Sequence, residues 1–99
     1  LAIQYLDSIV QLCAVKKTEV ILTGTPLHPQ YLSRIPTGIL NTYNNLMAKY
    51  GLRHFVYDRT TTVYPDSLYL NCDHLNTYGA ARFTQEFLKA LSTRRDSLR

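Results

Sequence analysis

The sequence predicts an α/β fold in which helices cover a small parallel sheet, and three observations lead to this prediction. Apolar residues recur at helical spacing in residues 1–16, 30–50 and 77–93. Two further apolar segments, residues 19–25 and 52–58, lie between these helices and have the composition of strands. The order is therefore helix, strand, helix, strand, helix. Such alternation is typical of parallel strands that are joined by right-handed crossovers.

The composition is that of one globular domain, residues 1–99. Hydrophobic residues make up 45% of the chain and charged residues 18%, which is ordinary for a folded domain. No apolar run is long enough to cross a bilayer. The net charge is +4, but the lysines and arginines form no stripe, so we expect no nucleic-acid partner. Two cysteines do not make a disulfide framework and leave the compartment undecided.

The first helix begins without a capping residue ahead of Leu1, which indicates a boundary inside a longer domain. The face that we expect it to bury consists of Ala2, Tyr5, Leu6, Ile9, Leu12 and Cys13. In the first strand, residues 20–22 form a continuous apolar core, as in a strand that is covered on both faces. The turn at residues 26–29 follows the carboxyl end of this strand, where open α/β sheets bind their ligands.

The second helix is followed by a strand that belongs nearer the edge of the sheet. The residues that we expect this helix to bury are Ile39, Leu40, Tyr43, Leu46, Met47 and Tyr50. Pro36 either kinks the helix or marks its first turn, and Gly51 suits its end. Residues 52–58 alternate in part between charged and apolar side chains, which favours a position near an edge.

The last helix follows a loop at residues 59–70, of which residues 68–70 form a short extended segment. Asn76 has the side chain of an N-cap. The helix face that we expect to be buried consists of Ala80, Phe83, Thr84, Phe87, Leu88 and Leu91. Two strands alone leave free backbone edges. We therefore expect the chain to pair with missing N-terminal strands or with a second copy of itself.

The most informative segment lies just before the last helix and reads Asn71-Cys72-Asp73-His74-Leu75-Asn76-Thr77-Tyr78-Gly79-Ala80. It places a histidine in a polar loop, two residues before the helix cap. The ring can then point into a cleft while the helix fixes its backbone. The segment resembles the last sequence block of the SGNH/GDSL hydrolases. In that block Asp-x-x-His, often continued as His-Leu-Asn-x-x-Gly-Ala, supplies the catalytic base.

The resemblance implies the C-terminal half of a three-layer, flavodoxin-like fold. Residues 20–26 resemble the penultimate strand of that fold with its proline turn, and residues 52–58 resemble the final strand. The similarity is to a bacterial branch of uncharacterised or cell-envelope SGNH-like proteins, some of them linked to acylation of surface polysaccharides. It implies an extracytoplasmic or cell-envelope parent protein, and an ester or an acylated glycan as substrate.

By the same resemblance, His74 is the general base that takes the proton of a serine hydroxyl, which then attacks an ester carbonyl. An imidazole suits this step because it changes charge near neutral pH. Asn71 stands where the family has the triad Asp, and loss of that charge costs about 10⁴-fold in a serine protease. Asp73 and Asp66 are candidates to replace the missing carboxylate in space. The chain contains no Gly-Asp-Ser nucleophile block.

Each of these residues also has a structural interpretation. His74 can brace the last helix, Asn71 can bond its local backbone, and Asp73 can bind nearby amides. His28 can contact substrate at the mouth of the cleft or make a turn contact between two prolines. The spacing of Cys72, Asp73 and His74 with His28 matches no zinc pattern, so we expect no metal and no cofactor.

The expected function is that of the C-terminal portion of an SGNH/GDSL-like hydrolase, an esterase or acyl-handling protein. This portion carries the base but lacks the nucleophile, and is expected to be inactive alone. The hydrolase interpretation predicts that His74, Asn71 and the turn at residues 26–29 line one cleft. Two alternatives stay open. One is a non-catalytic binding or assembly module that kept the fold, and the other is a small self-associating domain whose strand pairs across a two-fold axis.

Overall fold

The computed structural model describes residues 2–98, which form helices and two small sheets. In chain order the elements are α1 (Ala2–Val15), β1 (Ile21–Gly24), α2 (Pro29–Leu32), α3 (Thr37–Gly51), β2 (Phe55–Asp58), the 3₁₀ helix η1 (Asp66–Leu68), β3 (Tyr69–Asn71), β4 (His74–Leu75) and α4 (Thr77–Ser97). One strand pair is parallel and the other antiparallel. The mixed α/β class is therefore confirmed in its broad sense. The finer three-layer, flavodoxin-like arrangement is not confirmed by a two-stranded sheet.

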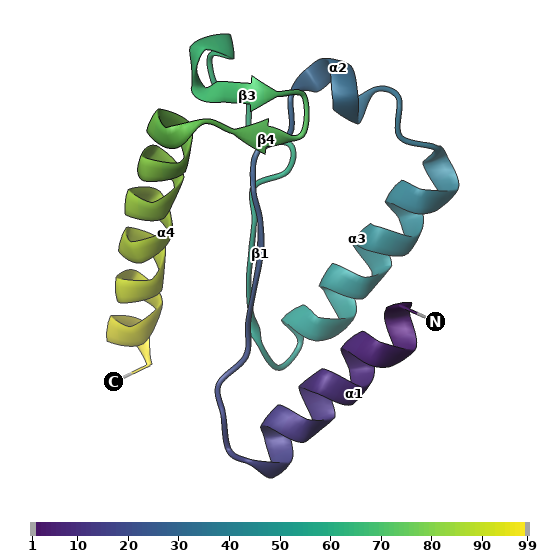
Figure 1. Ribbon diagram of the computed structural model, residues 1–99. Helices are drawn as coiled ribbons and strands as arrows, with labels where there is room; N and C mark the ends of the chain where they lie inside the picture. The colour runs from purple at the N-terminus through teal and green to yellow at the C-terminus, as the bar shows by residue number, and fades with distance from the viewer. Residues whose placement is uncertain (1, 99) are drawn as a thin grey trace.

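The parallel pair β1 and β2 forms the centre of the molecule. Their register runs from Ile21 opposite Phe55 to Gly24 opposite Asp58. Figure 1 shows this pair with α4 on one side and α1 and α3 on the other. The β3–β4 hairpin and α2 lie beyond the end of β1 from which the chain leaves the sheet. The carboxyl end of the parallel strands is thus the end at which the hairpin lies.

An aromatic cluster joins β2 to α4. Tyr57, only 6% exposed, lies with its ring centroid 5.7 Å from that of Phe83 and 5.6 Å from that of Phe87. Phe55 stacks on Phe87 at 6.4 Å. Because alternate residues of a strand point to opposite faces, Phe55 and Tyr57 share the face that α4 covers. This cluster is the main apolar contact of α4 with the parallel sheet.

The other face of β2 packs against α3. A polar contact there links the Tyr43 hydroxyl of α3 to the Asp58 carboxylate and to Thr60. Burial, and then the nearby Asp58 carboxylate, raise the pKa of Tyr43 to about 12. Gly24 makes room for this contact, since a Cβ there would lie 2.7 Å from both Asp58 Oδ1 and the Tyr43 hydroxyl. The helices α3 and α4 therefore contact opposite faces of the sheet.

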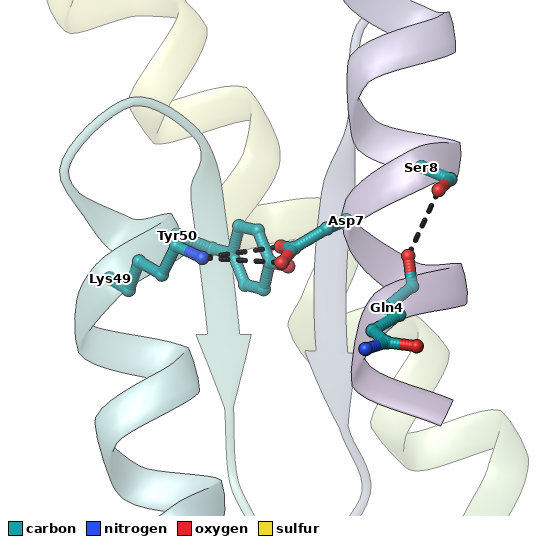
Figure 2. Close-up of polar contacts among 5 residues, drawn as sticks. All are labelled: Gln4, Asp7, Ser8, Lys49 and Tyr50. Carbon is teal, nitrogen blue, oxygen red and sulfur yellow. Dashed lines mark hydrogen bonds and ion pairs between the residues drawn. The ribbon is translucent and has the colours of Figure 1, made fainter. Parts of the chain in front are cut away.

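A hydrogen-bonded carboxylate attaches α1 to α3 (Figure 2). The hydroxyl of Tyr50 donates to Asp7, and Lys49 Nζ lies 3.2 Å from Asp7 Oδ1. The Ser8 hydroxyl on the same helix donates instead to the backbone carbonyl of Gln4. The hydrogen bond from Tyr50, and then that from Lys49, hold the pKa of Asp7 below its usual value of 3.8. Asp7 is thus a link between two helices that are far apart in sequence.

We expect the contact of Asp7 to weaken in acid. A folded-state pKa below the unfolded one contributes stability above the unfolded pKa of 3.8, and that contribution is lost as the pH falls through the folded value. Urea denaturation of the wild type and of Asp7→Asn, each at neutral pH and in acid, measures the contribution of Asp7 to the free energy of unfolding. The difference between their free energies of unfolding should narrow as the pH falls. An equal difference at both pH values would contradict the assigned role of Asp7.

The structure corrects the predicted buried face of α1. Tyr5 is 62% exposed, and Ile9 and Leu12 are each 58% exposed, whereas Leu6 and Cys13 are half-buried. The side of α1 that contains Asp7 contacts α3. Within residues 2–98 nothing covers the side that carries Tyr5, Ile9 and Leu12. The expectation that β1 is covered on both faces is met only in part. Ile21 and Leu22 are only half-buried, and within residues 2–98 β2 is the one strand that pairs with β1.

The other helices and parallel strands lie where the sequence predicts them, with differences at their ends and in their buried faces. Ile39 is 60% exposed and Leu88 58% exposed, although both were predicted to be buried, and Ala80 and Thr84 are exposed as well. The second helix is divided, with α2 ending at Leu32 and α3 beginning after Pro36, which serves as its N-cap residue. The helix α4 continues to Ser97, where the predicted helix stopped four residues earlier. The Arg94 guanidinium lies 4.9 Å from the centroid of the Phe55 ring, so this end of α4 contacts the sheet. Leu1 and Arg99 lie outside the described residues.

Candidate functional site

The segment around His74 forms a hairpin, where the sequence predicted a loop. In the antiparallel pair β3–β4, Asn71 lies opposite His74, and Cys72 and Asp73 form the turn between them. The Asn71 side-chain oxygen accepts a hydrogen bond from the Asp73 backbone N–H at 3.2 Å. An asparagine that bonds the backbone two residues ahead stabilises a tight turn. The residue at the position of the family's Asp therefore shapes the turn that presents His74.

The start of α4 fixes the base of the hairpin. Asn76 is the N-cap, as predicted, and its side-chain oxygen accepts from the Gly79 N–H at 2.9 Å. Its amide nitrogen donates to the Ser67 carbonyl at 2.7 Å, and its backbone N–H donates to the Leu68 carbonyl at 2.9 Å. Gly79 is buried against η1, where an added Cβ would lie 2.2 Å from the Leu68 carbonyl oxygen. The Asn-x-x-Gly spacing thus allows close contact between α4 and η1, the 3₁₀ helix that leads into the hairpin.

The turn after β1 is joined to the tip of the hairpin. The His28 backbone N–H donates to the Cys72 carbonyl at 3.0 Å. The His28 ring accepts from the Gln30 N–H at Nδ1, 3.2 Å away, so the proton on Nε2 is donated to Asp66 Oδ1 at 2.8 Å. The ring also meets Tyr69 edge to face. Because both ring nitrogens are bonded within the chain, these contacts favour the turn role of His28, and its contact with substrate stays a prediction.

His74 lies at the surface, with two oxygen atoms beside one of its ring nitrogens. Nδ1 is 2.9 Å from Asp73 Oδ1 and 3.0 Å from Asn71 Oδ1. Asn71 Oδ1 also faces the Asp73 N–H, so it acts as an acceptor. Both neighbours of Nδ1 are therefore acceptors, which assigns the proton of the neutral ring to Nδ1. Nε2 then carries the lone pair, and within residues 2–98 no hydrogen bond reaches it.

This arrangement can take up a proton at Nε2. The side chain of His74 is 66% exposed, so the lone pair is accessible to a molecule from solution. Once protonated, the ring gains a charge interaction with the carboxylate of Asp73, which Asn71 cannot supply. The chemistry available to this set is that of a general base with an anionic neighbour.

Three of the four predicted site residues meet around one ring: His74, Asn71 and Asp73. The fourth, His28, reaches the same hairpin through its backbone, while its ring bonds Asp66. Their predicted roles in catalysis and in substrate binding stay predictions. No serine hydroxyl in the described part of the chain is hydrogen-bonded to His74. A groove of about 570 Å³ lies between β2 and α4, and its walls include neither His74 nor Asn71.

Sequence reasoning missed two polar contacts that hold this end of the molecule. Asp66 bonds His28 across 38 residues, and the buried Tyr64 hydroxyl bonds Glu86, which also pairs with Arg82. Burial, and then the bond to Glu86, raise the pKa of Tyr64 to about 12. The sequence does not indicate these pairs. A Tyr or an Asp in a loop has many polar residues as possible partners, and only the folded chain selects one of them.

Within residues 2–98 there is no group of three or more His, Cys, Asp or Glu side chains that could hold a metal ion. None of the described helices has both the length and the apolar character that a bilayer crossing requires. Comparison with protein-family models finds no match, and neither curated proteins nor solved structures give one.

Proposed function

We propose that the chain is the base-bearing C-terminal portion of an SGNH/GDSL-like hydrolase, with His74 as the base. The observation that carries the proposal is the contact of His74 Nδ1 with two oxygen acceptors, which leaves the lone pair on the exposed Nε2. A base in this position accepts a proton from a hydroxyl that approaches from solution or from another segment. Asn71 orients the ring, and Asp73 supplies the negative charge that Asn71 lacks.

We further propose that the parallel pair is part of a flavodoxin-like, three-layer sheet. The contacts of α3 and α4 with opposite faces of β2 support this arrangement. The continuous apolar sequence of β1, typical of an inner strand, supports it as well. In such a sheet, ligands bind at the carboxyl ends of the strands. The hairpin with His74 lies at that end, as the bond from His28 to Cys72 indicates.

The substrate class that fits this proposal is an ester or an acylated glycan. An apolar cavity of about 130 Å³ lies beside the turn after β1. Its walls are formed by Leu27, Leu32, Ile35, Ile39, Leu40, Tyr43 and Thr60. An apolar cavity at the ligand-binding edge suits the hydrocarbon part of a short acyl group.

Hydrolysis of a short-chain ester tests the role of His74. Because the chain lacks the nucleophile, we expect no enzymatic turnover of p-nitrophenyl acetate, only the slow hydrolysis that an accessible imidazole gives by activating water; within residues 2–98 no serine is bonded to His74. We expect His74→Ala to lower this rate, while other nucleophilic side chains such as the exposed thiol of Cys72 keep it above that of buffer. The loss should be below the roughly 100-fold that a positioned base contributes in a complete site. The control is His54→Gln, which changes a half-buried histidine beside Tyr50 and should keep the rate.

The second candidate is a non-catalytic binding or assembly module. The neutral Asn71 and the lack of a serine bonded to His74 in the described residues favour it. The same assay separates the two. A rate that is unchanged in His74→Ala, or that falls equally in His54→Gln, would contradict the base and favour the module.

A further inference from the structure

The chain exposes far more surface than a compact monomer of its mass. Its accessible surface is 7355 Å², about 1,600 Å² more than the roughly 5,800 Å² that the scaling for folded monomers gives at 11.4 kDa. The radius of gyration is 15.0 Å, where about 13 Å is usual for this length. A standard protein interface covers about 800 Å² on each partner. The excess surface is therefore large enough to contain such an interface.

The most continuous apolar part of this surface is one stripe of α1. The stripe consists of Tyr5, Ile9, Leu12 and Val15, which are 62%, 58%, 58% and 76% exposed. These residues follow the spacing of one helix face. The stripe contains no charged residue, since Asp7, the acidic residue of α1, bonds Lys49 and Tyr50 of α3. An uncharged apolar stripe of this length is the kind of surface that a folded protein covers.

The outer edge of β1 is a second uncovered feature on this part of the molecule. Within residues 2–98 its only strand partner is β2, so its other edge has free backbone groups. Figure 2 shows α1 on the β1 side of the parallel pair and α3 on the β2 side. The sequence of β1, Ile-Leu-Thr-Gly, has no charge that would discourage pairing. The helix α1, which carries the stripe, and the free edge of β1 thus lie on the same side of the parallel pair.

The side of the sheet beyond β2 has a different character. The groove between β2 and α4 is bordered by Asp58 at the end of β2, by Arg59 after it, and by Glu86 and Lys89 of α4. Among the described residues, this side is therefore more polar than the edge of β1, whose sequence has no charge.

We propose that the α1 stripe and the β1 edge bind a second copy of this chain across a two-fold axis. The two β1 strands pair antiparallel, which joins the two small sheets into one of four strands, and the two α1 stripes pack on each other. A two-fold contact places a surface against itself, so a surface with charges of one sign would repel its copy. A stripe and an edge without charge meet this condition. The proposal does not depend on the role of His74. It applies to this chain by itself, since the further strands of the proposed three-layer sheet would cover the same edge of β1.

Analytical ultracentrifugation of the chain over a wide range of concentration tests this surface. We expect a monomer–dimer equilibrium, and we expect Leu12→Glu to raise the dissociation constant by about 100-fold or more. The reason is that the two-fold axis places the introduced charge in the interface twice. The matched control is Leu88→Glu on α4, since Leu88 is also 58% exposed but lies outside the stripe. The dissociation constant of this control should equal that of the wild type.

Hydrogen exchange under the same conditions tests the strand edge separately. Amides of residues 21–24 should exchange more slowly when the dimer is populated, and Leu12→Glu should abolish this protection. A wild type that stays monomeric throughout would overturn the proposal. So would open-ended oligomers, equal effects of the two glutamate substitutions, or a dimer with no added protection in β1.

Discussion

Replacing Gly79 with Ala is expected to lower the free energy of unfolding by about 2 to 3 kcal/mol, which is a large share of the stability of a small domain. The added Cβ would lie 2.2 Å from the Leu68 carbonyl oxygen and 3.1 Å from Leu75 Cβ. The first of these atoms belongs to the backbone, so a side-chain rotation cannot relieve the clash. Either α4 or η1 must shift, which breaks the bond from the Asn76 N–H to Leu68.

The same chain offers a control for helix propensity. Gly38 lies in α3, and a Cβ there would meet nothing within 4 Å. Gly38→Ala should therefore raise the free energy of unfolding by up to about 1 kcal/mol. Urea denaturation followed by circular dichroism measures both variants. A Gly79→Ala variant as stable as the wild type would show that α4 and η1 are not in close contact.

Replacing Tyr57 with Ala is expected to have the largest effect on stability of any change in the parallel sheet, about 3 to 4 kcal/mol. Tyr57 is 6% exposed and contacts the rings of Phe55, Phe83 and Phe87, while the Arg59 guanidinium lies 4.6 Å from its centroid. Removing the ring leaves a cavity between β2 and α4 where the surrounding side chains cannot fully collapse. The contacts of α4 with the sheet are then reduced to those that Phe55 makes with Phe87 and Arg94.

Tyr78→Ala is the matched control, because Tyr78 is 77% exposed on the same helix that carries Phe83 and Phe87. Its effect on the free energy of unfolding should stay within about 0.5 kcal/mol. Thermal or urea unfolding compares the two variants. Equal losses of stability in the two would contradict a core centred on Tyr57.

The parts of the fold that follow from local sequence were predictable. The apolar runs gave both parallel strands and their order, and helical spacing gave α1, the longer part of the second helix and α4. Asn76 was recognised as a cap because the side-chain chemistry of a cap is local. The contact of Asn71 and Asp73 with His74 joins residues at most three positions apart, and for this reason the sequence could bring the three together.

What the sequence could not give depends on contacts across the chain. Leu6 and Leu12 are equally apolar, and only the tertiary position of α1 decides that Leu6 is the more buried of the two. The extended segment predicted at residues 68–70 corresponds to β3. Its partner β4, and with it the hairpin, was missed because β4 is very short and a pattern of alternation needs a longer segment to be seen. The division at Pro36 was open to two interpretations, since a proline can either kink a helix or begin one.

The central claim is that the neutral ring of His74 has its proton on Nδ1 and its lone pair on an exposed Nε2. Long-range ¹H–¹⁵N correlation spectra of the full chain, recorded at a pH where the imidazole is neutral, measure this directly. The account predicts a protonated Nδ1 and an unprotonated Nε2 for His74, with Asn71→Leu weakening this preference. It predicts the reverse pattern for His28, whose Nε2 donates to Asp66. A His74 ring that is protonated on Nε2 would contradict the account.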